Sequence, residues 1–101
     1  MEKHIYSIQE ISRLVEPVAK TYGVERLYVF GSYARGDVTT DSDIDFRLVK
    51  GQIKDFFVLA AFQRALQGQF SIPIDVLTTG ALSKDFLDSI SGEEVSVYES
   101  A

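Results

Sequence analysis

The chain has 101 residues, of which 46% are hydrophobic and none is cysteine, and its formal net charge at pH 7 is −5. Its length allows one domain, residues 1–101, and its acidic charge argues against a long nucleic-acid partner, which a basic surface would bind. The lack of cysteine excludes disulfides and thiolate metal sites and fits a reducing cytoplasm, and no apolar run approaches the ~20 residues of a membrane-spanning helix.

The N-terminal segment predicts a helix that ends at Gly23. Ser7-x-x-Glu10 has the pattern of a capping box, and apolar side chains follow it at helical spacing. These are Ile8, Ile11, Val15, Val18 and Tyr22. Pro17 interrupts the pattern, so we expect either a kink at this residue or two short helices that abut there.

Two strands and a turn are predicted next. Residues 27–30 form an apolar run rich in β-formers, which favours a buried strand, and Gly31 breaks it. A brief helical turn over 32–35 and a polar loop over 36–42 follow. In the second predicted strand, residues 43–50, alternation gives two faces. One face carries Asp43, Asp45, Arg47 and Val49, and the other carries Ile44, Phe46 and Leu48.

The second half predicts a helix, a strand, a helix and an edge strand. The helix over residues 55–69 is more apolar than one core-facing stripe requires. A strand over 74–78 follows it, Ser83 is placed to cap another helix, and residues 95–97 suggest a last short strand. The fold class expected is α/β, a small mixed β-sheet flanked by helices.

Gly31-Ser32 and Asp43-Ile44-Asp45 are the most informative residues of the chain. On a strand, side chains two residues apart point to the same face, so Asp43 and Asp45 would project together and repel each other. A hard cation such as Mg²⁺, which binds carboxylates together with substrate phosphates, would remove that repulsion. A glycine followed by a hydroxyl residue, where a strand gives way to a helix, lets backbone N–H groups approach a phosphate closely.

This arrangement resembles the signature of the nucleotidyltransferases related to DNA polymerase beta. The fuller strings Phe-Gly-Ser-Tyr-Ala-Arg-Gly, residues 30–36, and Ser-Asp-Ile-Asp-Phe, residues 42–46, are similar to those of the minimal nucleotidyltransferase (MNT) branch. The resemblance extends from residues 22–24 through 74–77 to the tail at 94–99, and so covers almost the whole chain. It implies a polymerase beta-like nucleotidyltransferase fold.

Asp75 is the candidate third acid of a metal site. In-line nucleotidyl transfer needs one cation to neutralise the triphosphate and a second to activate the attacking hydroxyl, with ligands shared by both. Asp75 is a single acid within the apolar run Ile-Asp-Val-Leu, where an unpaired charge is costly. The alternative is that Asp75 caps a strand end or pairs with Arg47. The resemblance implies that Asp43, Asp45 and Asp75 are the catalytic acids and bind two Mg²⁺ ions.

Three further residues are candidates for the same site. The resemblance and the anion-binding bend assign Gly31 and Ser32 to nucleotide binding, with the Ser32 hydroxyl on the β- or γ-phosphate and no role as a covalent nucleophile. Arg35 either reaches a phosphate or pairs with Asp37 or Asp41. Arg47 either stabilises the crowded acids through a salt bridge or contacts the nucleotide.

The resemblance implies transfer of AMP from ATP to a hydroxyl, a tyrosine in a HEPN-family toxin, with this chain as its antitoxin in a hetero-oligomer. The lack of an acceptor domain is consistent with a protein acceptor. The surplus apolar surface around Phe57, Ala60 and Ala61 is a candidate docking site, although burial in the chain's own core is the alternative explanation for these residues.

Two other functions stay open from the sequence. The chain could neutralise its partner by binding alone, although three mutually repelling acids have no purpose in a pure binder. It could also be the catalytic subunit of a small-molecule nucleotidyltransferase, although similar enzymes carry a second helical domain. Base selectivity depends on pocket walls that the motif does not specify.

Overall fold

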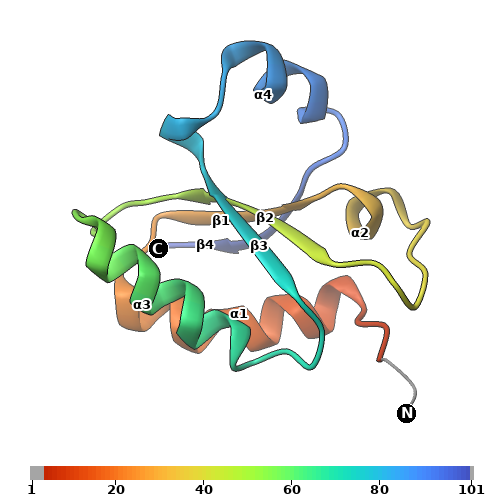
Figure 1. Ribbon diagram of the computed structural model, residues 1–101, viewed down its shortest axis with the longest axis horizontal. Helices are drawn as coiled ribbons and strands as arrows, with labels where there is room; N and C mark the ends of the chain where they lie inside the picture. Colours follow the sequence, from red (N-terminus) through yellow and green to blue (C-terminus); the bar gives the residue numbers. More distant parts are fainter. Residues whose placement is uncertain (1–3, 101) are drawn as a thin grey trace.

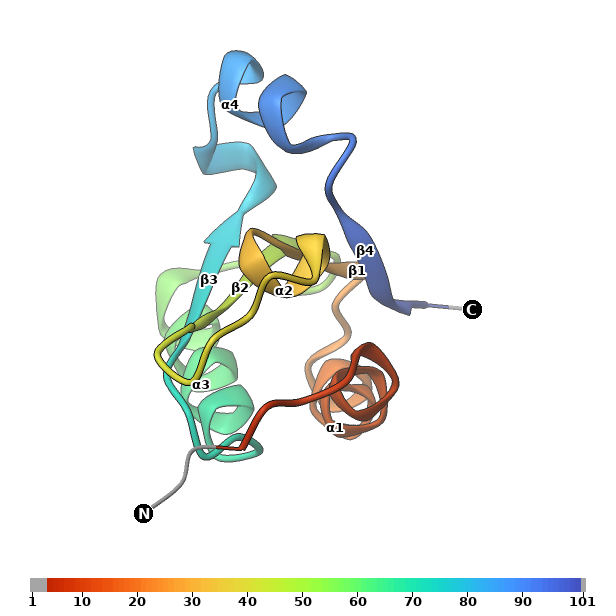
Figure 2. The same ribbon diagram turned by 90° about the vertical axis from the view of Figure 1, so that its right-hand side faces the viewer.

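The computed structural model describes residues 4–100, and it places a four-stranded sheet between two helices on one face and an irregular excursion on the other (Figures 1 and 2). In chain order the elements are α1 (Ile8–Tyr22), β1 (Arg26–Phe30), α2 (Ser32–Arg35), β2 (Ile44–Val49), α3 (Phe56–Gln67), β3 (Ile74–Thr78), the 3₁₀ helix η1 (Thr79–Ala81), α4 (Lys84–Ile90) and β4 (Val95–Glu99). The strand order is β3-β2-β1-β4. The predicted mixed sheet flanked by helices is confirmed.

Helix α1 begins at the predicted capping box and ends at Gly23, whose φ of 67° is left-handed. It runs as one helix through Pro17, so the alternative of two abutting helices is wrong. A proline inside a helix costs about 3 kcal/mol because it removes a hydrogen bond and its ring crowds the preceding turn. Complete burial of Ile11, Val15 and Ala19 along the core-facing side offsets that cost.

One face of the sheet is apolar and buried, as the alternation in β2 predicts. Ile44, Phe46 and Leu48 are fully buried in the core cluster with side chains of α1 and α3. Strand β2 pairs antiparallel with β1 and parallel with β3, and α3 makes the crossover between β2 and β3. The polar face of β2 therefore looks away from α1 and α3, toward the side on which α4 lies (Figure 2).

Helix α3 begins at Phe56, with the Asp55 side chain accepting a hydrogen bond from the Val58 N–H at 2.9 Å. Phe62 and Leu66 are buried in the core, but Phe56 and Phe57 are 77% and 84% exposed. Burial in the chain's own core is therefore the wrong explanation for Phe57. Ala60 and Ala61 are half-buried.

Between β3 and β4 the chain leaves the sheet, forms η1 and α4, and returns (Figure 1). Ser83 caps α4 as predicted, accepting a hydrogen bond from the Phe86 N–H at 3.1 Å. The Phe86 ring stands edge-on to Phe30, the last residue of β1, with centroids 5.9 Å apart. This contact packs α4 next to the bend that follows β1.

Candidate active site

The bend at Gly31 brings the chain against Asp45. Gly31 has φ 74° and ψ −149°, a conformation essentially restricted to glycine. A Cβ at this position would lie 2.7 Å from Asp45 Oδ2. The Gly31 carbonyl accepts hydrogen bonds from the N–H groups of Ala34 and Arg35 at 3.1 and 3.0 Å, which starts the predicted helical turn α2. Glycine is thus required here both for backbone conformation and for the space that the carboxylate occupies.

Ser32 is the first residue of α2, where the opening N–H groups of a helix have no partner within it. Within residues 4–100 the Ser32 hydroxyl forms no hydrogen bond. Because the Ala34 and Arg35 N–H groups donate to Gly31, the N–H groups left open at this helix start, within residues 4–100, are those of Ser32 and Tyr33. Together with the free Ser32 hydroxyl they form an arrangement that can receive phosphate oxygens.

The three predicted acids lie on two adjacent strands. Asp45 of β2 and Asp75 of β3 are partners in the parallel register, so their side chains leave the same face of the sheet. Asp43 was expected inside the strand but precedes β2 by one residue, since the ladder opens with the Ile44 N–H donating to the Pro73 carbonyl at 3.2 Å. Among residues 4–100, none of these three carboxylates forms an ion pair or accepts a hydrogen bond.

The charges of the neighbouring acids act on Asp45. Burial raises the pKa of Asp45 above its ordinary value, and the negative charges of Asp75 and Asp43 raise it further. The positive charge of Arg35 acts in the opposite direction. Asp45 is half-buried, whereas Asp43 and Asp75 are exposed. The neighbouring negative charges therefore disfavour the ionised form of Asp45, and a bound cation would favour it.

The chemistry of these donors fits Mg²⁺, which prefers carboxylate oxygens and keeps other positions for substrate phosphates. In the part of the chain from residue 4 to 100, no group of three or more His, Cys, Asp or Glu side chains is gathered closely enough to hold a metal ion. Bound Mg²⁺ would neutralise the carboxylates and polarise a phosphoryl oxygen.

Arg35 is held by two acids. Its Nε donates to Asp37 at 3.2 Å and its Nη1 to Glu93 at 3.4 Å. The pairing with Asp37 is one of the expected alternatives, whereas Glu93 was not anticipated. The guanidinium is about half exposed, which leaves it accessible to an anionic ligand.

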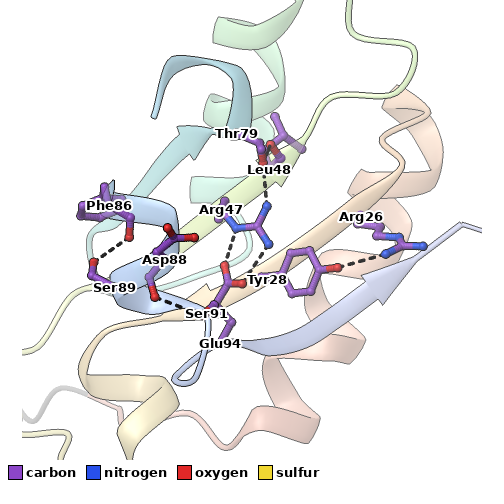
Figure 3. A network of polar contacts seen from close by, with 10 residues as sticks. All are labelled: Arg26, Tyr28, Arg47, Leu48, Thr79, Phe86, Asp88, Ser89, Ser91 and Glu94. Carbon is purple, nitrogen blue, oxygen red and sulfur yellow. Dashed lines mark hydrogen bonds and ion pairs between the residues drawn. The ribbon is translucent and has the colours of Figure 1, made fainter. Parts of the chain in front are cut away.

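Arg47 pairs with neither Asp75 nor the other two acids, so both salt bridges considered for it from the sequence are wrong. Figure 3 shows its guanidinium turned toward Glu94, with Nε and Nη2 both donating to that carboxylate, the latter at 2.9 Å. Nη1 donates to Thr79 Oγ1 at 2.8 Å, and the hydroxyl of Thr79 donates to the Leu48 carbonyl at 2.9 Å. The guanidinium carbon lies 4.3 Å from the centre of the Tyr28 ring. Glu94 is 47 residues away along the chain, so no local pattern could reveal this pair.

Two surface hollows help to locate the site. One of about 360 Å³ lies between α3 and β3 and is lined in part by Asp75, Gln63 and Arg64. A larger one of about 720 Å³ lies beside Gly23 and Gly51, at the opposite end of β1 and β2 from the acids. The larger hollow therefore does not belong to the candidate site.

A glycine bend at the end of one strand, facing acids on the next two, defines a protein of the nucleotidyltransferase class. The chain belongs to the polymerase beta nucleotidyltransferase family, whose model, described as "Polymerase beta, Nucleotidyltransferase", matches residues 13–101. No helix between residues 4 and 100 has the length and apolar character needed to cross a membrane.

Known proteins resemble the chain over most of its length. "Putative protein adenylyltransferase MJ0435" of Methanocaldococcus jannaschii is 34% identical over 91 residues, which is 90% of this chain and 98% of that protein. The fold is similar to that in a crystal structure of a toxin-antitoxin with AMP-PNP, with TM-score 0.73, 15% identity and coverage of 88% of this chain and 73% of that one. It is also similar to that in the tri-AMPylated HEPN toxin in complex with MNT antitoxin from Shewanella oneidensis, with TM-score 0.68, 14% identity and coverage of 92% and 73%.

Proposed function

We propose that this protein transfers AMP from ATP to a hydroxyl group of a partner protein, and that the partner is a HEPN-family toxin which it neutralises as an antitoxin. The observation that carries the proposal is the placement of Asp45 and Asp75 as register partners beside the Gly31 bend. This arrangement joins a set of metal-binding acids to an anion-binding helix start.

In this proposal each site residue has a distinct task. Asp43, Asp45 and Asp75 hold two Mg²⁺ ions, and Asp75 also assists removal of the acceptor's proton. Ser32 and the N–H groups of the bend bind the β- or γ-phosphate, and Arg35 leaves Asp37 and Glu93 to contact the triphosphate. The attacking hydroxyl forms the new bond to the α-phosphorus of ATP, and pyrophosphate leaves with the electron pair of the broken P–O bond.

Residues 1–101 are proposed to act as one catalytic domain, and the acceptor is proposed to be a tyrosine of the partner, by analogy with the family. Two observations support this choice of acceptor and partner. Phe56 and Phe57 present exposed rings at the start of α3, which suit a hydrophobic partner surface. The toxin-antitoxin structures with AMP-PNP and with an AMPylated HEPN toxin share this fold. A cytoplasmic location is in keeping with the cysteine-free sequence.

The intact mass of the partner tests the reaction. After incubation of the two proteins with ATP and Mg²⁺, the partner is expected to gain one or more AMP units. The Asp43→Asn/Asp45→Asn variant, which keeps the size of both side chains, is expected to form the complex and to leave the partner's mass unchanged. A partner that is neutralised equally well by this variant would support inhibition by binding alone and contradict the catalytic proposal.

A further inference from the structure

Arg47 stands where it could interfere with metal binding. It lies two residues after Asp45 on the same face of β2, so the two residues are about 7 Å apart along the strand. Asp75 lies beside Asp45 on β3. Arginine pairs readily with carboxylates through two parallel hydrogen bonds, and such a pair would occupy the oxygens that a cation needs.

Glu94 holds the guanidinium of Arg47 in another direction. It engages two of the guanidinium nitrogens, and the third donates to Thr79 at 2.8 Å. Both charged side chains are only 12% exposed, which makes this the most buried ion pair described between residues 4 and 100. The positive charge that lowers the pKa of Asp45 is that of Arg35 from α2, and its effect is smaller than the effects of burial and of the two neighbouring acids.

We propose that Glu94 is a positioning residue for the metal site: by binding Arg47 it keeps this guanidinium off Asp45 and Asp75, so that their oxygens stay available to a divalent cation. The inference rests on the proposed metal role of these acids and adds a residue that contacts neither metal nor substrate. A purely structural pair would hold the excursion in place without any effect of Arg47 on metal affinity.

The two roles differ in how a second substitution acts. In Glu94→Gln the Arg47 guanidinium loses its charged partner and becomes a competitor for the acids, so metal affinity falls. In Arg47→Met/Glu94→Gln no competitor is present, so affinity returns. If the pair were only structural, the double variant would regain only the small part of the affinity that comes from removing one positive charge near the acids, and would stay well below wild type.

Titration with Mn²⁺ alone, followed by calorimetry on the full chain, measures this directly without any requirement for activity. We expect Glu94→Gln to weaken Mn²⁺ binding about 10- to 100-fold, as loss of a residue that orients metal ligands does, and Arg47→Met/Glu94→Gln to restore it. Glu99→Gln is the matched control, because it breaks the exposed pair between Arg26 and Glu99 at 3.2 Å, at the far end of β4, and should leave Mn²⁺ affinity unchanged. The Mg²⁺ concentration that supports half-maximal AMP transfer should follow the same order.

Thr79→Val keeps the test valid if Glu94→Gln does not fold. It removes one guanidinium hydrogen bond without creating an unpaired charge, and a smaller loss of Mn²⁺ affinity that Arg47→Met reverses is expected. Wild-type Mn²⁺ affinity in folded Glu94→Gln would overturn the role of Glu94 while leaving the metal role of the acids intact, and so would a loss of affinity that Arg47→Met fails to reverse. Where Glu94→Gln does not fold, wild-type affinity in folded Thr79→Val has the same meaning. Absence of Mn²⁺ binding to the wild-type protein overturns the metal role itself and the inference with it.

Discussion

Gly31 meets two requirements of the bend, a backbone conformation restricted to glycine and space for the Asp45 carboxylate. Replacing Gly31 by alanine should separate the effects of losing each. The backbone at φ 74° and ψ −149° disfavours any side chain, at a cost of about 1–3 kcal/mol. For about 2 kcal/mol in a domain of this size, the expected fall in Tm is roughly 8–16 °C. The added methyl group would also meet Asp45 Oδ2 at 2.7 Å. Because that oxygen is the end of a rotatable side chain, it can turn aside at little steric cost, but it then leaves its position in the site.

Two other glycines serve as matched controls. Gly36 has φ 83°, but a Cβ there meets no atom within 4 Å, so Gly36→Ala adds strain of about 1–2 kcal/mol without touching Asp45. A Cβ on Gly80 also meets nothing within 4 Å, and its φ lies outside the left-handed range, so Gly80→Ala should leave both stability and activity unchanged.

Thermal unfolding and AMP transfer, measured at a temperature where all variants are folded, distinguish the effects. Gly31→Ala should lose stability and about 100-fold in transfer rate, since a displacement of about 1 Å at a reacting site has that effect. Gly36→Ala should lose stability alone. Transfer by folded Gly31→Ala at the wild-type rate would refute the argument that this glycine makes room for an Asp45 carboxylate that takes part in the reaction.

Three further outcomes follow from the structure. Burial and the neighbouring acids raise the pKa of Asp45 in the folded state above its ordinary value of 3.8, so the free energy of unfolding falls as pH rises from 3.8 through the raised pKa. Asp45→Asn should remove this loss and raise Tm at neutral pH. A pH profile of urea denaturation that is the same for wild type and Asp45→Asn would contradict this expectation. Phe57→Ser should weaken partner binding roughly tenfold in a calorimetric titration and change stability by no more than about 0.5 kcal/mol, because the ring is 84% exposed; equal affinity would exclude this ring from the interface. Ser7→Ala should lower the free energy of unfolding by about 1 kcal/mol through loss of the hydrogen bond from the Glu10 N–H at 3.1 Å, with AMP transfer by the folded protein unaffected.

Local patterns predicted the strands and the faces of their side chains because strand alternation repeats every two residues. The faces assigned to Asp45 and Ile44 depend only on that period and are confirmed. Asp43 was placed one residue too far into the strand, because the beginning of the ladder depends on the Pro73 carbonyl, far along the chain. Continuity of α1 through Pro17 could not be predicted either, since it depends on tertiary burial on both sides of that residue.

The pairs that involve Glu93 and Glu94 lay beyond sequence reasoning because they depend on how the excursion folds back over the sheet. The chain returns to the sheet so that β4 lies beside β1. Just before β4, the consecutive acids Glu93 and Glu94 therefore contact two different elements. Glu93 reaches Arg35 at the end of α2, and Glu94 reaches Arg47 on β2. The helical turn α2 after the Gly31 bend and the acid-bearing strand β2 are thus both bound to residues 93–94, so displacement of this segment would disturb both halves of the candidate site together.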